Sequence, residues 1–302
     1  MQTGKHVYIA HIINLKEEIK MTTSRKIKNI HTAPQVMMGN IALRQPFPLH
    51  GFAQFSPFIL LHHFDFDIEP GNNSFDVPPH PHRGFCPVTF MYEGRVSHND
   101  SLGNSSVIGD NEVQWINAAR GIIHSETTDK DFVETGGRFQ GIQLWINLPA
   151  AEKMKTPSYM PITKNEIVLI EKDGVHFRLI SGKYLDKKGP APSNVFTAMM
   201  RMQLNSKFEI DFASSYNVAI YILEGDIEIN NLEKATQHQL VTFENTDGTI
   251  TLEALSPVKL LLMAGEPIHE PLVTHGPFVM NTQTEILEAM RDYQQGKMGY
   301  LY

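Results

Sequence analysis

The chain has 302 residues, of which 41% are hydrophobic and 20% are charged. This length allows two domains of about 150 residues each, and the hydrophobic fraction excludes a chain that is disordered throughout. Its 26 Lys and Arg residues against 33 Asp and Glu residues give a formal net charge of −7, which argues against broad contact with nucleic acid or an anionic membrane.

The first 24 residues are expected to form an extension ahead of the first domain. Residues 1–20 carry charged side chains around a short apolar patch, and they lack the long apolar run and cleavage site of a secretory signal. Two interpretations stay open: an upstream extension followed by a start at Met21, or a first short helix. No segment of the chain approaches the roughly 18 uninterrupted apolar residues of a membrane span.

Two strand-rich regions follow. In residues 52–148, short runs of Val, Ile, Phe and Thr alternate with turn residues, and no helical pattern separates them. This spacing is typical of an antiparallel sandwich or barrel, so we expect an all-β fold. A proline-bearing polar stretch at residues 149–161 precedes a second strand-rich region at residues 167–266. We therefore expect a first domain at residues 25–155 and a second at residues 156–302.

The two regions contain the same hairpin motif. Residues 90–96 have the sequence Phe-Met-Tyr-Glu-Gly-Arg-Val, and residues 221–227 have Tyr-Ile-Leu-Glu-Gly-Asp-Ile. Both predict a strand, a glycine turn and a second strand, and Gly94 and Gly225 stand 131 residues apart. Because the two regions are also similar in length, the motif indicates a duplicated domain.

Residues 282–295 change period and predict an amphipathic C-terminal helix that lies on one of the sandwiches. Thr284 is the expected cap, with a glutamate nearby. The apolar positions expected to face the sandwich are Ile286, Leu287, Met290 and Tyr293.

Cysteine is rare in this chain and histidine is common. The single cysteine, Cys86, excludes a disulfide framework and a structural cysteine–zinc site, and it fits a reducing compartment, for which we expect the cytoplasm. The 14 histidines are therefore the main candidates for binding a metal ion.

Two pairs of ligand-type side chains have members two residues apart. His80 and His82 form one pair, and His124 and Glu126 form the other. Residues two apart in a strand point to the same face, so each pair can present both side chains to one ion. A single His-x-His pair says little, because chance placement gives about 0.6 such pairs at this composition. Two pairs together form a set of three imidazoles and one carboxylate, which suits Fe(II) and also Mn, Ni, Cu or Zn.

Several sequence blocks resemble the pirin family of the cupin superfamily. One of them is His-Pro-His-Arg-Gly-Phe at residues 80–85, and another is Gly-Ile-Ile-His-Ser-Glu at residues 121–126. The remaining blocks occupy residues 100–105, 114–115, 265–268 and 275–281. The resemblance extends over roughly residues 25 to 300, with the blocks in the expected order.

The resemblance implies two antiparallel cupin β-sandwich (jelly-roll) domains, with a non-haem iron site in the first. The implied ligands are His80, His82, His124 and Glu126. The second domain is expected to lack the metal, because the residues just before Tyr221 contain no His-x-His pair. Some pirins are associated with quercetin 2,3-dioxygenase activity, and nuclear eukaryotic members with transcriptional co-regulation.

The leading hypothesis is therefore a metal-dependent oxygenase that acts on a small aromatic substrate such as a flavonol. It implies that the flavonol binds the iron through a deprotonated hydroxyl, with Glu126 as both ligand and proton acceptor, and that dioxygen cleaves the ring with release of carbon monoxide. The alternative is a metal-dependent regulatory module that binds a protein partner without turnover. Neither hypothesis involves direct contact with nucleic acid or a membrane.

One position departs from the usual cupin pattern. Most cupins place a glutamate shortly after the second histidine, where this chain has Cys86. Plain strand alternation puts Cys86 on the same face as His80 and His82, whereas a bulge at Gly84 breaks that register. Of the two roles that follow, burial as a small apolar residue is favoured over a thiol beside the iron.

Other polar and aromatic residues leave two interpretations. Arg83 either orients an anionic group or lies on the surface. His62 and His63 are interpreted as ordinary hydrogen-bonded histidines rather than a second metal site, and His98 and Asp100 as loop or strand-edge residues. The aromatic residues that line either a substrate pocket or, as favoured for most, the sandwich core are Phe85, Phe90, Trp115, Phe139 and Trp145.

Overall fold

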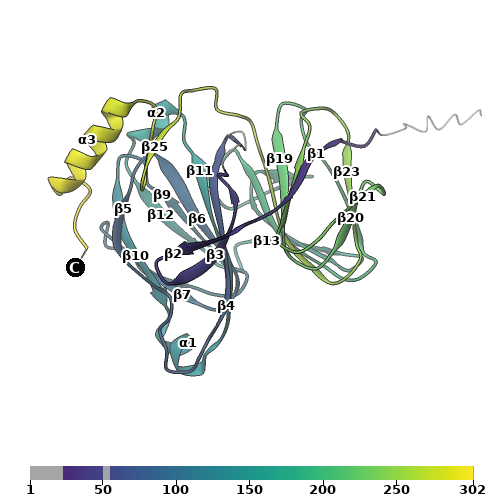
Figure 1. Cartoon of the computed structure of the whole chain (residues 1–302), viewed down its shortest axis with the longest axis horizontal. Coiled ribbons are helices and arrows are strands. Elements are labelled where there is room, and N and C mark those ends of the chain that lie inside the picture. The colour runs from purple at the N-terminus through teal and green to yellow at the C-terminus, as the bar shows by residue number, and fades with distance from the viewer. Residues whose placement is uncertain (1–22, 50–54, 302) are drawn as a thin grey trace, which may run out of the picture.

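The computed structural model describes residues 23–49 and 55–301. The chain folds into two β-sandwiches that lie side by side, each made of a seven-stranded and a four-stranded sheet (Figure 1). The all-β expectation is therefore confirmed, whereas the expected extension at residues 1–24 falls almost wholly outside the described residues.

The first sandwich is built mainly from the N-terminal half of the chain. Its seven-stranded sheet has the order β12 (Ser158–Ile162), β9 (Val113–Asn117), β6 (Phe85–Glu93), β11 (Gly137–Asn147), β4 (Phe58–Ile68), β3 (Ile41–Phe47) and β2 (Gln35–Met38). Its four-stranded sheet has the order β5 (Asp76–His82), β10 (Ile122–Thr128), β7 (Val96–Asp100) and β8 (Ser105–Ile108). The short helices on either side of β11 are α1 (Lys130–Thr135) and α2 (Ala150–Lys153).

The second sandwich repeats this arrangement. Its seven-stranded sheet has the order β1 (Ile27–Thr32), β22 (Gln239–Phe243), β19 (Asn217–Glu224), β24 (Val258–Gly265), β17 (Phe196–Met202), β14 (Val175–Ser181) and β13 (Val168–Lys172). Its four-stranded sheet has the order β18 (Lys207–Asp211), β23 (Thr249–Ala254), β20 (Ile227–Ile229) and β21 (Glu233–Ala235). The remaining elements are β15 (Lys183–Tyr184), β16 (Lys187–Lys188), β25 (Val273–His275), β26 (Phe278–Met280) and α3 (Gln283–Gln294).

The two sandwiches exchange one strand in each direction. β1 comes first in the described chain, yet it pairs with β22 of the second sandwich, with Ile30 opposite Val241. β12 follows residue 155, yet it pairs with β9 of the first sandwich, with Tyr159 opposite Ile116. The division into domains at residues 25–155 and 156–302 remains a proposal. The strand pairs β1–β22 and β9–β12 connect the two parts across this boundary.

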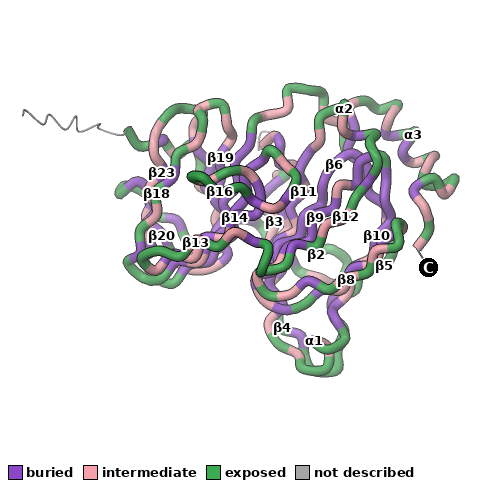
Figure 2. The backbone as a smooth tube through the Cα atoms, turned by 180° about the vertical axis from the view of Figure 1, so that it is seen from behind, coloured by how far each residue is buried: buried purple, intermediate pink, exposed green. Residues whose placement is uncertain are grey.

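The seven-stranded sheets pack against each other and bury one continuous core between the sandwiches. Along β6, Val88, Phe90 and Tyr92 are all buried in this core, and along β19 so are Tyr221 and Leu223. Figure 2 shows the central strands of this region as buried backbone. Because side chains alternate along a strand, the residues between these face the interior of their own sandwich. The outer face of β6 therefore joins the two sandwiches, and its inner face is left for a site.

The duplicated hairpin motif lies at equivalent places in the two sandwiches. It joins β6 to β7 through Gly94 in the first and β19 to β20 through Gly225 in the second. Both glycines have positive φ angles, 92° and 81°. A Cβ atom on Gly225 would lie 2.2 Å from the Pro257 carbonyl oxygen, so glycine is required for conformation and for space. The prediction of a duplicated domain is confirmed.

The predicted C-terminal helix is present as α3 with a different cap, and of its predicted apolar contacts Ile286 and Met290 pack on the sandwich. Thr282, not Thr284, caps it, in a reciprocal capping box with Glu285. Ile286 and Ala289 are buried against a cluster that includes Ile123 of β10, whereas the predicted contacts Leu287 and Tyr293 are 57% and 39% exposed. The helix thus covers the outer side of the first sandwich, away from the second (Figure 1). Among the helices of the described residues, none is long and apolar enough to cross a membrane.

Candidate metal centre

Adjacent strands bring three of the predicted site residues together. β5 pairs with β10, and His80 lies directly opposite His124. His82 is two residues further along β5 and shares the face of His80. The ring centroids are 4.7 Å apart for His80 and His82, 4.3 Å for His80 and His124, and 4.9 Å for His82 and His124. One ligand atom from each side chain lies within 4.8 Å of the other two.

Two of these histidines are buried. His82 is 2% exposed and contacts the backbone of Pro277, whereas His124 is 0% exposed and neither of its ring nitrogens has a hydrogen-bond partner. Burial, together with the neighbouring imidazoles, lowers the pKa of both residues well below its ordinary value, so both rings are neutral. Buried polar atoms are normally hydrogen-bonded, and a group of orphaned imidazole nitrogens that face one another is what a metal ion would satisfy.

His80 completes the group from its half-exposed edge. Its Nδ1 lies 2.9 Å from the carbonyl oxygen of Pro78. Because a carbonyl oxygen can only accept, Nδ1 carries a proton, and Nε2 is the ring nitrogen left to bind a metal ion. A backbone hydrogen bond of this kind is the usual way in which a metal-ligating histidine is oriented.

Glu126 lies in the same cavity but is hydrogen-bonded to the opposite sheet. The pairing between β10 and β5 is irregular between His124 and Glu126, and the carboxylate is not part of the group of ligand atoms within 4.8 Å of one another. Oε1 accepts from Gln114 Nε2 and, at 3.4 Å, from Thr89 Oγ1, and Oε2 accepts from Gln143 Nε2 at 3.1 Å. These donors come from β9, β6 and β11, three adjacent strands of the seven-stranded sheet.

The surroundings of Glu126 also fit a bound cation. The residue is 3% exposed, all of its hydrogen-bond donors are neutral, and it forms no ion pair with any lysine or arginine of the described residues. A buried carboxylate without a counter-charge is costly. A divalent cation held by the nearby histidines would supply that charge.

The donors to Glu126 belong to a polar row across the inner face of the sheet. Gln114 lies opposite Thr89, Thr89 opposite Gln143, and Gln143 opposite His62. Residues directly opposite on neighbouring strands share a face, so these four side chains form a wall that faces β5 and β10. The sequence showed these residues only as isolated polar positions, because their strands are far apart along the chain.

A cavity of about 210 Å³ is lined by His62 and Gln143 of this wall and by His80 and His82. Its lining residues are Met38, Leu43, His62, Phe64, Phe75, Val77, His80, His82, Glu126, Gln143, Trp145 and Pro277. Trp145 has its ring centroid 5.4 Å from that of His82, and Phe85 packs behind it at 4.3 Å. The core interpretation is confirmed for the other three aromatic residues, since Phe90 and Trp115 lie in the core between the sandwiches and Phe139 packs among Phe64 and Phe75.

His98 and Asp100 were wrongly expected at a loop or strand edge. They are 1% and 2% exposed and lie directly opposite Glu126 and His124 on β7. Burial alone would raise the pKa of Asp100, but hydrogen bonds from His98 and Asn104 hold it below its ordinary value. The His98 ring stacks on Tyr159 at 4.1 Å. Only the pairing of β7 with β10 shows that these two residues face the interior.

Cys86 and Arg83 lie outside the cavity. Gly84 has a φ of 91° and breaks the register between β5 and β6, so Cys86 points into the core between the sandwiches, where burial raises the pKa of its thiol to about 12. The apolar interpretation of Cys86 is confirmed. Arg83 is 4% exposed, donates to the Arg120 carbonyl at 2.6 Å and pairs with Asp292 of α3 at 3.1 Å. It is neither a surface residue nor a ligand for an anion.

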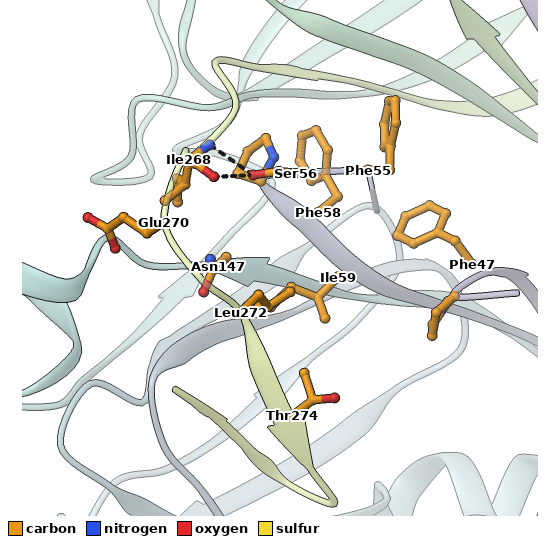
Figure 3. A pocket seen from close by; sticks show the side chains of 12 residues that line it. Phe47, Phe55, Ser56, Phe58, Ile59, Asn147, Ile268, Glu270, Leu272 and Thr274 are labelled. Carbon is orange, nitrogen blue, oxygen red and sulfur yellow. Dashed lines mark hydrogen bonds between the residues drawn. The ribbon is translucent and has the colours of Figure 1, made fainter. Parts of the chain in front are cut away.

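The remaining candidates do not form a second metal site. His62 Nε2 hydrogen-bonds Gln45, and His63 Nδ1 hydrogen-bonds the Tyr221 hydroxyl at 3.0 Å, as expected of ordinary histidines. A further cavity of about 140 Å³ lies where Ser56 and Ile268 hydrogen-bond each other (Figure 3). Its described lining residues include no histidine, and the group of ligand-type side chains found among the described residues lies in the first sandwich.

The family profiles that match this chain cover both sandwiches. The profile described as "Pirin" matches residues 40–146, and the profile described as "Pirin C-terminal cupin domain" matches residues 197–299. A pirin-like protein of Solanum lycopersicum is 36% identical over 253 residues, which are 81% of this chain and 82% of the relative.

Solved structures are also similar to this chain over most of its length. The crystal structure of a quercetin 2,3-dioxygenase from Acinetobacter baumannii has a TM-score of 0.87 and 31% sequence identity, and the match covers 93% of this chain and 100% of that one. The bacterial pirin YhhW from Escherichia coli, in complex with nickel(II), has a TM-score of 0.63 and 22% identity over 80% of this chain and 100% of that one, a likeness that shows the fold alone.

Proposed function

The chain belongs to the pirin family, and from this premise we propose that it is a metal-dependent oxygenase acting on a flavonol-type substrate. The proposed metal is Fe(II), with Mn, Ni, Cu or Zn as alternatives, and the proposed ligands are His80, His82, His124 and Glu126. A relative that shares 31% of its residues over 93% of this chain is named a quercetin 2,3-dioxygenase, which supports the substrate class.

One observation carries the proposal. His82 and His124 are buried, neither ring nitrogen of His124 has a hydrogen-bond partner, and both rings face His80, which lines a cavity together with His82. Three imidazoles and one carboxylate suit a divalent first-row metal and leave positions open on it. When bound, this metal would supply Lewis-acid and redox chemistry beside the cavity.

The protein's own residues then bind and orient the substrate. Phe64, Phe75 and Trp145 form apolar walls for a planar ring and keep water from the reacting atoms. The cavity lies below the roughly 300 Å³ that is common for ligand sites, which favours a small planar substrate over a bulky one.

Glu126 is the proposed proton acceptor for the substrate hydroxyl. Its carboxylate reaches the cavity, and its second role is that of the fourth ligand. Gln114, Thr89 and Gln143 donate to its carboxylate oxygens and hold it in place. The Trp145 indole N–H donates to Gln143 Oε1 at 3.1 Å and so fixes the direction of the Gln143 amide.

Turnover of quercetin by the metal-loaded protein tests this proposal. The protein is loaded with each candidate metal, incubated with quercetin under air, and followed by loss of flavonol absorbance, oxygen uptake and carbon monoxide release. The matched variants are Glu126→Gln, which keeps the size of the side chain and removes its charge, and Glu126→Ala. We expect turnover that both variants lose. If no metal gives turnover above the Glu126→Ala background while metal is bound, the oxygenase proposal is wrong and the regulatory alternative takes its place.

A further inference from the structure

His62 occupies the wall of the cavity that faces the histidine group. It lies on β4 directly opposite Gln143, at the end of the polar row that begins at Gln114, and its side chain lines the cavity. Most of the neighbouring lining residues on this side are apolar, among them Leu43 and Phe64. A polar ring at this position is therefore placed to contact whatever molecule occupies the cavity.

A chain of hydrogen bonds fixes the tautomer of His62. Gln45 Nε2 donates to the Pro48 carbonyl oxygen at 2.8 Å, which identifies the other end of the Gln45 amide as its oxygen. That oxygen, Oε1, lies 2.8 Å from His62 Nε2. An amide oxygen can only accept, so His62 Nε2 carries the proton and Nδ1 is left with a lone pair. Burial lowers the pKa of His62 to about 4, so the ring stays neutral and this lone pair is present at neutral pH.

The Nδ1 atom of His62 is an acceptor that the protein does not use. The only hydrogen bond of this side chain within the described residues is the one from Nε2 to Gln45, and Nδ1 is not among the atoms sealed from water. The amide of Gln143, by contrast, is engaged at both ends, by Glu126 and by Trp145. A free acceptor on a residue that lines the cavity beside apolar residues such as Leu43 and Phe64 favours ligands that bring a donor to it.

We propose that His62 is a specificity-determining residue, whose Nδ1 accepts a hydrogen bond from a phenolic hydroxyl of the aromatic ligand, other than the hydroxyl that faces the metal. This inference rests on the proposed function, because it takes the ligand to be a hydroxylated aromatic molecule. It assigns His62 to recognition of the far end of the ligand, across the cavity from His80, His82 and His124.

Binding measured without oxygen tests the inference apart from turnover. The probes are quercetin and 3-hydroxyflavone, which keeps the hydroxyl proposed to face the metal and lacks the others. Each is titrated by calorimetry into the anaerobic, metal-loaded protein. The variants are His62→Phe, which keeps a ring and removes the acceptor, and His62→Asn, whose amide oxygen replaces Nδ1. Metal content and thermal unfolding of each variant establish that the site and the fold are intact.

We expect His62→Phe to bind quercetin about tenfold more weakly than the wild type, as the loss of one hydrogen bond predicts, and to bind 3-hydroxyflavone within about twofold. The His62→Asn variant should retain most of the preference for quercetin. An equal loss for both probes, or no loss for quercetin, overturns the inference even if turnover persists. Binding that depends on His62 without turnover in air supports the inference and contradicts the oxygenase, and failure of quercetin to bind the wild type overturns both.

Discussion

The two sandwiches share a fold and differ in the side chains of their interiors. The duplicated hairpin aligns Thr89 of the first with Ile220 of the second, 131 residues later. Thr89 pairs with Gln114 on one side and Gln143 on the other, whereas Ile220 pairs with Val241 and Leu262 at the same places. A polar row in one sandwich is therefore a row of aliphatic side chains in the other.

The facing sheets show the same contrast. The inner face of the first four-stranded sheet presents the histidine group and Glu126, whereas the second presents Ile250, Leu252, Ile227 and Ile229, all buried. The fold thus does not require polar residues in its interior. Where they occur, buried and in part without partners, they indicate a site that serves function rather than stability.

The largest loss of stability is expected when a residue of the polar row is introduced into the second sandwich. Leu262→Gln places the counterpart of Gln143 in an aliphatic core, where the amide finds no partner. We expect a loss of about 3 kcal/mol in the free energy of unfolding from the removed packing and the unsatisfied amide. Thermal and denaturant unfolding measure it. Stability within about 1 kcal/mol of the wild type would show that both interiors accept polar residues.

A second prediction concerns the residue that joins the two hairpins. Lys259 is 10% exposed on its side chain and pairs with both Glu93 and Glu224, the equivalent glutamates of the duplicated motif. Lys259→Met leaves these carboxylates beside each other without their shared cation. We expect a loss of about 2 kcal/mol in unfolding free energy at neutral pH, since both glutamates keep partial contact with water.

The pH dependence of this loss has a defined sign. Burial alone would raise the pKa of Glu224, but hydrogen bonds from Gln140 and Lys259, and the nearby charges, hold it below its ordinary value of 4.5. A carboxyl group with a lowered pKa stabilises the fold above its ordinary pKa, and this stabilisation is lost as the pH falls through the lowered value. The gap between wild type and Lys259→Met should therefore narrow below about pH 4.5 in unfolding scans. A gap that widens there would contradict the assignment.

A third prediction exchanges Gln143 for its counterpart. Gln143→Leu should leave the unfolding free energy of the metal-free protein within about 1 kcal/mol of the wild type, because the fold tolerates an aliphatic residue at this place. Glu126 loses one of its donors, so we expect metal affinity to fall about tenfold, as for other residues that orient a ligand. Competition with a chelator measures that affinity. Unchanged affinity would mean that Gln143 does not position Glu126.

The smallest effect on the site is expected from Cys86. Cys86→Ala removes a buried sulfur from the core between the sandwiches and should cost about 1 kcal/mol in stability. Because Cys86 faces away from the histidines, metal content and affinity should not change, and the native thiol should resist labelling until the protein unfolds. A changed metal affinity would place the sulfur at the site after all.

Much of the candidate site and of the duplicated fold could be predicted from the sequence, because these features depend on local patterns. Alternation within β5 and β10 predicted that His80 and His82 share a face, as do His124 and Glu126, and the hairpin motif predicted the duplication. The pairing of β5 with β10 and the direction of the Glu126 carboxylate depend on contacts between distant strands. No local pattern encodes them.

The sequence-based predictions that left the position of a residue open or wrong share one physical cause. His98 and Asp100 lie beside a glycine turn, where polar residues are usually exposed, and only the pairing of β7 with β10 shows that they face the interior. The register break at Gly84 turned Cys86 to the other sandwich, and the capping box made Thr282 the cap of α3. In each case the pairing or the conformation of the backbone, rather than the residue type, determined the role of the side chain.

Metal content tests the central claim most directly, namely that the first sandwich holds a metal at its histidine group. The wild type, His124→Val and the control variant His275→Ala, at an exposed position, are purified without chelator, reconstituted with Fe(II) anaerobically and measured by elemental analysis. We expect about one metal ion per chain in the wild type and the control, and less than about a tenth in His124→Val. Equal metal in all three, or none recoverable in the wild type, would contradict the account.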